Sequence, residues 1–227
     1  MFSFYQYLEE GIHDPSTFKV VFLAGGPGSG KSYLQGQSVP KSLGLKTVNS
    51  DDAFEALMKK QGKEMDPETI ASPEGQSTRA LAKEITKKRF NFWVEGRLGL
   101  IIDGTGKDYN KIKKQKIALE AKGYDCYMIF VNTSEEIALT RNAERPRSLP
   151  DDMVRKLWLE VQKNIGAFQN LFGGNNFIIV DNNSAGEEVF LMVFKQIKKF
   201  LNKPVKNYIA LQWIEYTKSI IKLRGKS

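Results

Sequence analysis

Short apolar segments alternate along the chain with longer stretches in which apolar residues recur at helical spacing. The apolar segments are rich in β-branched residues and lie at residues 19–24, 46–49, 98–103, 124–131 and 177–181. Segments of this length, separated by stretches long enough for crossover helices, predict five strands of a parallel sheet covered on both faces. The predicted fold class is therefore α/β.

Turn and capping residues bound several of the predicted helices. Thr133 with Glu136 three residues later predicts a capping box, and Pro150 followed by two aspartates predicts the start of the next helix. Residues 61–76 contain two glycines and two prolines with few apolar residues. That composition predicts a long surface loop rather than a linker between domains.

A last helix is predicted after Pro204. Apolar residues follow there at alternating steps of four and three and form one stripe, made of Val205, Ile209, Trp213, Tyr216, Ile220 and Leu223. The favoured interpretation is that this stripe packs on the body of the protein; the alternative is a docking face for a second subunit or another protein. We expect one domain over residues 1–204, followed by a basic helix and tail over residues 205–227.

Charge is concentrated at the carboxyl-terminal end of the chain. The net charge is +8, and residues 195–227 carry nine Lys or Arg against one acid, so this stretch accounts for all of it. A basic tail attracts nucleic acid, anionic lipid or an acidic partner, although solvated lysines on a surface helix are also common. We expect that the basic tail can bind nucleic acid.

Other features exclude several classes of protein. The apolar run at residues 20–26 is far shorter than the roughly 20 residues of a membrane span, and the first ten residues lack the pattern of a secretory signal. We therefore expect a cytoplasmic protein without membrane contact. Cys126 lies in an apolar run and is expected to be buried and inert. His13 has no neighbouring metal ligand, so it gives no basis for a zinc site.

A phosphate-binding motif provides the strongest chemical signal. Residues 25–32 read GGPGSGKS and fit G-x-x-x-x-G-K-S, a pattern expected by chance in about one chain in a hundred of this length. The motif directly follows the predicted strand 19–24 and leads into a helical pattern, which is its required context. Glycine-rich backbone amides and the helix amino terminus bind phosphates. The predicted nucleotide ligands are Gly26, Gly28, Ser29, Gly30, Lys31 and Ser32.

Within this motif Lys31 is expected to bridge the β- and γ-phosphates, and the Ser32 hydroxyl is expected to bind Mg²⁺. An N-K-x-D guanine-reading motif is absent, since residues 110–113 read NKIK. That argues against a regulatory GTPase, while GTP remains open as an alternative to ATP as the donor.

Two acidic positions follow predicted strands, where ligands of an α/β sheet bind. Asp51 is the first candidate for a general base that accepts the proton of an attacking hydroxyl, with Asp52 in reserve. The alternative role of Asp51 is to cap the following helix. Asp103, at the end of the third predicted strand, is expected to hold Mg²⁺ as a Walker-B acid does. Thr105 is expected to line the acceptor pocket.

Arginines cluster between residues 141 and 151. Arg141 and Arg145 share one helix face, and Arg147 follows before prolines and polar residues break the helix. Such a segment predicts a mobile lid whose guanidiniums close over the triphosphate and neutralise the charge that develops on the transferred group. Arg141 and Arg145 are therefore candidate catalytic residues, and Arg147 is a candidate nucleotide ligand. Surface salt bridges are the alternative.

These residues together resemble P-loop kinases, namely the zeta-toxin-like kinases and the 5′-hydroxyl polynucleotide kinases, which include phage-encoded members. The segment NSDD at residues 49–52 is similar to the polynucleotide-kinase segment whose Asp is the general base. The segment LIIDGT at residues 100–105 is similar to the corresponding zeta-toxin strand. The resemblance spans roughly residues 19–181 and implies a three-layer P-loop fold with strand order 2-3-1-4-5.

One position departs from the resemblance. Both families usually have an Arg three residues after the catalytic Asp, whereas this chain has Phe54. Arg79 or Arg97 are candidate replacements for the missing charge.

The sequence as a whole predicts an Mg²⁺-dependent kinase that moves the γ-phosphoryl group of ATP to a hydroxyl. The acceptors considered are a nucleic-acid 5′-hydroxyl, a nucleoside or nucleotide, and a nucleotide sugar. The alternative is an ATPase or nucleotide-binding interaction protein that docks on nucleic acid or a larger assembly through its basic tail. A phage-encoded protein would act in the host cytoplasm.

Overall fold

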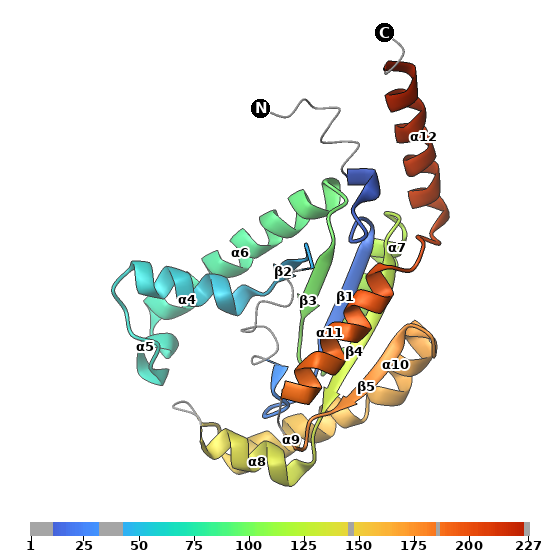
Figure 1. The fold of residues 1–227 in the computed structure, drawn as a ribbon. Coiled ribbons are helices and arrows are strands. Elements are labelled where there is room, and N and C mark those ends of the chain that lie inside the picture. The colour runs from blue at the N-terminus through green and yellow to red at the C-terminus, as the bar shows by residue number, and fades with distance from the viewer. Residues whose placement is uncertain (1–10, 32–42, 145–147, 185–186, 225–227) are drawn as a thin grey trace.

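The computed structural model describes residues 11–31, 43–144, 148–184 and 187–224, without the side chains of Glu187 and Arg224. Within these ranges the chain forms a five-stranded parallel sheet in the order β2-β3-β1-β4-β5 (Figure 1). The predicted strands and their order are confirmed, with ends that shift by at most two residues. The strands are β1 (Lys19–Ala24), β2 (Lys46–Val48), β3 (Leu100–Asp103), β4 (Asp125–Asn132) and β5 (Phe177–Asp181).

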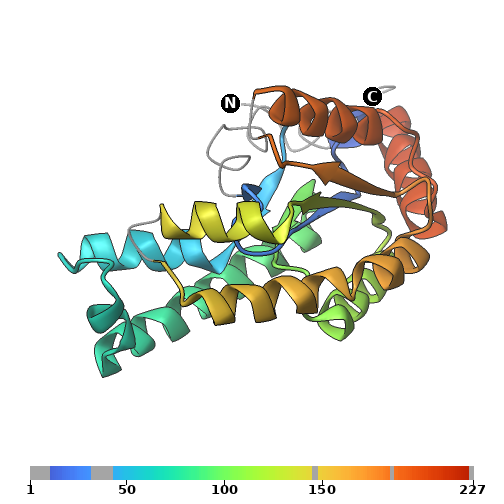
Figure 2. The same cartoon turned by 90° about the horizontal axis from the view of Figure 1, so that it is seen from below.

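Helices cover both faces of the sheet and make a three-layer structure (Figure 2). Helix α11 lies on one face, whereas α7 and α10 lie on the other. Helices α4, α5 and α6 project beyond the β2 edge of the sheet (Figure 1). The helices are α4 (Ser50–Lys60), α5 (Pro67–Ala71), α6 (Pro73–Glu95), α7 (Tyr109–Glu120), α8 (Glu135–Ala143), α9 (Asp151–Gln162), α10 (Ile165–Phe172), α11 (Glu187–Leu201) and α12 (Tyr208–Arg224).

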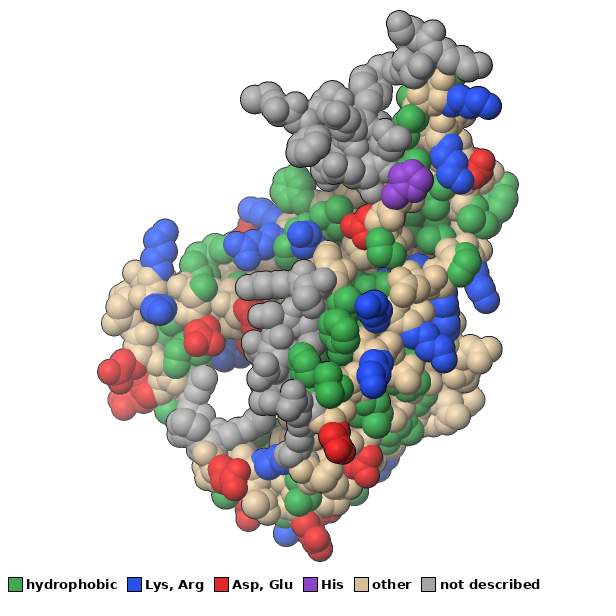
Figure 3. All heavy atoms as spheres, viewed as in Figure 1, with side chains coloured by type: hydrophobic (Ala, Val, Ile, Leu, Met, Phe, Trp, Pro, Cys, Tyr) green, Lys and Arg blue, Asp and Glu red, His purple; other side chains and the backbone are tan. Residues whose placement is uncertain are grey.

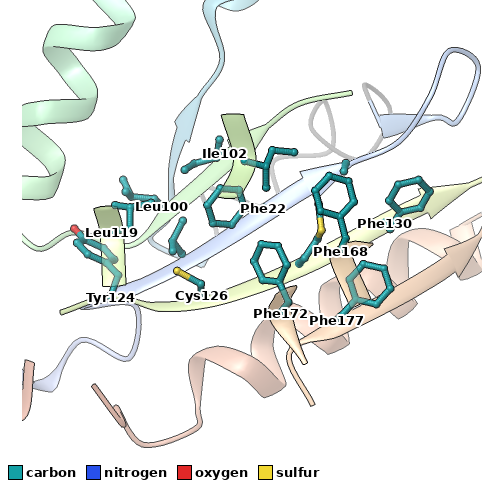
Figure 4. Packing of buried hydrophobic residues seen from close by; sticks show 14 of the residues in the cluster. Phe22, Leu100, Ile102, Leu119, Tyr124, Cys126, Phe130, Phe168, Phe172 and Phe177 are labelled. Carbon is teal, nitrogen blue, oxygen red and sulfur yellow. The ribbon is translucent and has the colours of Figure 1, made fainter. Parts of the chain in front are cut away.

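Strand β1 supplies side chains to two apolar cores. Successive side chains of a strand point to opposite faces, so Val21 and Leu23 pack toward α11 and Phe22 packs toward α7 and α10. Figure 4 shows this second core, in which the ring of Phe22 meets Phe172 of α10 with centroids 5.4 Å apart. Burial on both faces explains why the strand is apolar throughout.

The predicted loop over residues 61–76 is wrong in part. Pro67 and Pro73 each lie in the first turn of a helix, where proline loses no hydrogen bond. Asp66 and Ser72 cap these helices by accepting hydrogen bonds from backbone N–H groups three residues later. The same prolines therefore start α5 and α6 instead of interrupting a helix.

The cap of α8 lies one residue later than predicted. Ser134 is the N-cap, and its hydroxyl accepts a hydrogen bond from the backbone N–H of Ile137 at 3.3 Å. Thr133 instead directly follows the last residue of β4 and is buried. The predicted helix start at Pro150 is confirmed, since α9 begins at the next residue.

Helix α12 packs at the end of the sheet where the strands begin. Ala210 is fully buried there. The rings of Trp213 and Phe18 pack edge to face, with their centroids 5.5 Å apart. The prediction that the whole apolar stripe packs on the body of the protein is wrong in part, because Ile209 and Tyr216 are 44% and 66% exposed. The helix is therefore rotated away from the orientation that its large apolar residues predict.

A close approach of two backbone segments and a partly buried carboxylate account for this orientation. A Cβ atom on Gly123 would lie 3.2 Å from the backbone nitrogen of Ala210, so the two segments meet where both residues are small. Asp125 accepts hydrogen bonds from the backbone N–H groups of residues 206–207 and pairs with the buried ammonium of Lys19 at 2.8 Å. These polar contacts fix the position where α12 begins. They could not be predicted from the spacing of the large apolar residues.

Lysines are exposed on the last two helices. Lys195, Lys198 and Lys199 of α11 reach solvent, and Figure 3 shows Lys and Arg side chains over α11 and along α12.

Cys126 is 4% exposed, as predicted, and burial raises the pKa of its thiol, which disfavours the reactive thiolate. None of the helices in the described ranges combines the length and apolar content that a membrane crossing requires.

Candidate active site

The phosphate-binding loop follows β1 and requires glycine at two positions. Gly28 and Gly30 have φ angles of 68° and 85°, a region that other residues rarely adopt. A Cβ on Gly28 would lie 2.7 Å from the backbone of Ala138, and one on Gly30 would collide with the side chain of Asn182. Ser32, the predicted Mg²⁺ ligand, lies outside the described residues.

Two side chains bind carbonyl oxygens of the loop. Asn182, buried after β5, donates a hydrogen bond to the Ser29 carbonyl at 2.7 Å, and Arg141 donates to the Gly28 carbonyl at 3.1 Å. Carbonyl oxygens repel phosphate, so engaging them with protein donors favours a loop that offers N–H groups to an anion. Nothing in the loop motif itself predicted Asn182.

Arg141, predicted as a catalytic lid residue, contacts the phosphate-binding loop directly. Besides Gly28 it donates to the carbonyl of Asn182 at 2.8 Å, so it braces the loop against the end of β5. Arg145 and Arg147 lie outside the described residues. The side chain of Asn142 is buried and bonds both the N–H and the carbonyl of Leu149, which ties the two described ends of the predicted lid together.

Sheet register brings the loop lysine to the acid at the end of β3. Leu23 is the register partner of Asp103, and the Gly104 N–H donates to the Leu23 carbonyl at 2.9 Å. The Lys31 ammonium consequently lies 3.9 Å from a carboxylate oxygen of Asp103. The sequence predicted both residues, and the parallel pairing of β1 with β3 explains why they meet.

Asp103 suits the role of a magnesium ligand. It is a carboxylate with a side chain only 16% exposed, beside the lysine of the phosphate-binding loop. Among the described residues no group of three His, Cys, Asp or Glu could hold a metal by itself. Mg²⁺ at this place would take its other ligands from Ser32, phosphate oxygens and water, as is usual for this ion.

Asn49 links the second acidic segment to Asp103. It is the N-cap of α4, accepting from the Asp51 N–H at 2.8 Å, which contradicts the capping alternative for Asp51. Its amide donates to Asp52 at 3.0 Å and to Asp103 at 3.4 Å. The pKa of Asp52 is raised by partial burial and then by the charges of Asp103, Asp51 and Glu55.

The position that departs from the family resemblance has a structural role. Phe54 is 2% exposed and packs α4 on α6. The guanidinium of Arg79 lies over its ring at 4.6 Å, so one candidate replacement cation is next to the altered position. Arg97 precedes β3 at the opposite end of the sheet and stacks on Trp213 at 4.5 Å, which excludes it from the site.

A cavity opens beyond Asp103, between α6 and α7. Its volume is ≈ 610 Å³, and it is lined by Thr105, the residue expected to line an acceptor pocket, together with Ser50 and Asp103. Four lysines also line it, namely Lys83, Lys87, Lys107 and Lys111. Sequence reasoning missed these lysines, although the first two are spaced one helical turn apart on α6 and could have indicated a basic face.

The family model for Zeta toxin matches residues 6–186, which is most of the chain. The chain belongs to the Zeta toxin family. The match contains the phosphate-binding loop, both acidic segments, Arg141 and the cavity. It ends before α11, so the basic helices lie outside the Zeta toxin match. No curated protein matches the chain in sequence.

Three solved structures with low sequence identity show the same fold. A chain of the PezAT chromosomal toxin-antitoxin system of Streptococcus pneumoniae is 14% identical, with 88% of this chain and 98% of that chain covered and a TM-score of 0.52. A candidate kinase from Chloroflexus aurantiacus is 14% identical, with 82% and 96% covered and a TM-score of 0.53. Shikimate kinase from Acinetobacter baumannii, in complex with shikimate, is 16% identical, with 85% and 99% covered and a TM-score of 0.50. Nothing in these likenesses supports a phage origin.

Proposed function

We propose that this Zeta toxin family protein is an ATP-dependent kinase that transfers the γ-phosphoryl group to a hydroxyl of a small molecule. The proposal rests on three features that lie together where strands β1 and β3 end. Lys31 of the phosphate-binding loop lies 3.9 Å from Asp103, and a cavity of ≈ 610 Å³ begins at that carboxylate. A nucleotide on the loop would therefore direct its γ-phosphate toward a space that can hold an acceptor.

The donor side would act by electrostatic stabilisation. Loop N–H groups and Lys31 bind the phosphates and offset the negative charge that spreads over the transferred group. Ser32 and Asp103 would hold Mg²⁺, which neutralises further charge on the β- and γ-phosphates. Asn182 and Arg141 keep the loop in shape through its carbonyl oxygens. Arg145 and Arg147 remain candidates for a lid.

The acceptor hydroxyl needs a group that takes its proton, and two neighbouring aspartates are available. Asp51 was the first candidate from the sequence, but the contacts favour Asp52. Asp52 shares the Asn49 amide with Asp103, and its raised pKa brings it closer to neutral pH, which suits a general base. We therefore assign the base to Asp52 and retain Asp51 as the alternative.

The proposal is tested by transfer from labelled ATP to a panel of acceptors. Nucleosides, nucleotides, nucleotide sugars, sugars and 5′-hydroxyl oligonucleotides are incubated with the protein, ATP and Mg²⁺, and labelled products are separated. We expect a labelled product that Lys31→Ala does not form and that excess unlabelled GTP suppresses less than unlabelled ATP does. ATP hydrolysis with no labelled acceptor in any reaction would instead support the ATPase alternative.

A further inference from the structure

The outward face of helix α11 carries a row of lysines. Lys198 and Lys199 follow Lys195 by three and four residues, the spacings that place side chains on one face of a helix. Asn202 continues this face by one turn, because its N–H still donates to the Lys198 carbonyl at 3.1 Å. All four residues are exposed, and Figure 3 shows lysines over α11 on the face in view. We call these four side chains the α11 row.

The inward face of α11 holds the row in place on the sheet. Val193, Ile197 and Phe200 are buried in the core on this side, and the Phe200 ring stacks on Tyr127 of β4 with centroids 4.8 Å apart. The helix therefore cannot turn its lysines away from solvent without opening that core. At 1.5 Å per residue the row is about 10 Å long. It is a short, straight and preorganised line of hydrogen-bond donors.

The charge of the row is not balanced by neighbouring acids. Elsewhere, Lys88 pairs with Glu84 at 2.7 Å, and Lys218 of α12 pairs with Glu215 at 2.9 Å. Among the ion pairs between described residues, none involves a lysine of the row. Like charges one helical turn apart repel and weaken a helix. A ligand with several negative charges would relieve that repulsion.

The apolar residues of α11 argue against a membrane surface as this ligand. Phe190 and Phe194 pack against the core, and only the smaller side chains of Leu191 and Met192 are exposed, by 43% and 48%. Helices that lie in a membrane surface turn their large apolar side chains outward and insert them between the lipids. Helix α11 has the opposite orientation.

The composition of the row also favours nucleic acid over an acidic protein. Lysine is depleted in protein–protein interfaces, which are enriched in aromatic residues, and the described side chains of α11 include no exposed aromatic ring. Phosphates of nucleic acids are contacted by Lys and by polar side chains such as Asn. Phosphates follow one another every 3.4 Å or so along each strand of a duplex, so about 10 Å of helix faces about three of them.

We propose that α11 binds the phosphate backbone of duplex DNA through Lys195, Lys198, Lys199 and Asn202. The α11 row lies outside the Zeta toxin match, which ends at residue 186, and none of its residues lines the cavity at Asp103. This binding goes beyond the proposed kinase reaction and does not depend on it. Because phosphates carry no base-specific information, binding is independent of DNA sequence. The sequence analysis expected nucleic-acid binding in the tail over residues 205–227, whereas the unpaired lysine row lies on the preceding helix.

The experiment measures binding of a fluorescently labelled duplex of about 20 base pairs by anisotropy, between about 50 and 200 mM salt. We expect K195Q/K198Q/K199Q to bind about tenfold more weakly or worse at about 100 mM salt. The logarithmic salt slope should become shallower by about 0.9 for each phosphate that is no longer neutralised. Lys195→Glu, which keeps both lysines of the last turn, should weaken binding at least about threefold.

The matched control is K59Q/K60Q/K63Q, which removes the same charge near the end of α4. Two of its lysines lie in the last turn of their helix, as Lys198 and Lys199 do in α11, so both triple variants lose a similar interaction with the helix dipole. The control should change DNA affinity less than about twofold. Both triple variants should keep the wild-type turnover and ATP affinity, which shows that each protein is folded.

Two outcomes would overturn the proposal directly: wild-type protein that does not bind the duplex, and equal weakening by the α11 variant and the α4 control. A third arm uses L191Q/M192Q and vesicles that contain phosphatidylserine. We expect this variant to bind DNA as wild type does. If wild type binds the vesicles but not DNA, and L191Q/M192Q loses the vesicles, the surface is a membrane site and the proposal is wrong. The kinase assay is unaffected by any of these results.

Discussion

The proposed donor and acceptor sides of this molecule are built in different ways. On the donor side, glycines with positive φ and two side chains that bind loop carbonyls shape the backbone itself into the binding surface. On the acceptor side, exposed lysines of α6, of α7 and of the loop before α7 line a cavity. A site made of backbone leaves a compact motif in the sequence, whereas a site made of side chains on separate helices leaves none.

The largest effect expected on the donor side comes from Lys31→Ala. Lys31→Ala removes the ammonium next to Asp103 that the proposed mechanism uses to offset charge on the transferred group, and we expect turnover to fall by about 10³-fold or more. Steady-state kinetics with the best acceptor measure this, and circular dichroism checks the fold. Full turnover would show that the loop motif does not act as proposed.

The second prediction tests the general base, which is proposed to lie between the donor and acceptor sides. Asp52→Asn should lower kcat by about 10²-fold or more, the usual contribution of a general base, while ATP affinity changes only a few fold. Asp51→Asn is the matched control, because it removes the same charge one residue away on the same helix. If Asp51→Asn shows the large loss and Asp52→Asn does not, the base is Asp51.

The two sides also differ in how far the sequence predicted them. The five strands and Lys31 with Asp103 were predicted because an apolar run and a short motif each express local rules. Asn182 was not, because it lies 153 residues after Ser29 in the sequence and reaches it only once β4 has paired with β1 and β5 with β4.

Chain topology likewise hid the acceptor side. Lys83 lies on α6 and Lys107 in the loop before α7, and only the packing of these helices around the end of β3 brings the two lysines to one cavity. Arg97 was a wrong candidate for the same reason, since it is close in sequence to β3 but lies at the other end of the sheet. The sequence therefore indicates which residues carry suitable chemistry, but it does not show which of them lie together in the folded chain.

A third prediction sharpens the view that the donor side depends on a braced backbone. Asn182→Ala should leave the Ser29 carbonyl without its buried donor and raise KM for ATP about five- to tenfold, with a smaller change in acceptor KM. Asn170→Ala, an exposed position on α10, is the control. An equal rise in both KM values would show that Asn182 supports the fold as a whole.

The acid limb of the pH profile offers a smaller test of the acceptor side. The base must be deprotonated, so kcat/KM should fall as pH decreases through the raised pKa of Asp52. Glu55 contributes to raising that pKa, so Glu55→Gln should lower it and move the acid limb to lower pH by a few tenths of a unit. Glu68→Gln on α5 is the control. A shift to higher pH would contradict the assignment.

The smallest effect on turnover is expected from the basic tail, which belongs to neither side. Lys206, Lys218 and Lys222 are exposed around α12, so replacing all three with Gln should leave kcat and KM unchanged. If the tail binds nucleic acid, the same variant should bind DNA more weakly and with a shallower salt dependence. The logarithmic slope should become shallower by about 0.7–0.9 for each DNA phosphate that the variant no longer neutralises.

This substitution is a sharper test than removing the helix. Truncation after Lys203 would expose Phe18 by deleting Trp213 and would also remove the backbone N–H groups that Asp125 binds, so a drop in stability and a drop in charge would coincide. Replacing Lys59, Lys60 and Lys63 with Gln removes the same charge at the end of α4 and controls for net charge. Equal weakening by both variants would assign DNA binding to overall charge, and unchanged binding by the α12 variant would refute a role for the tail.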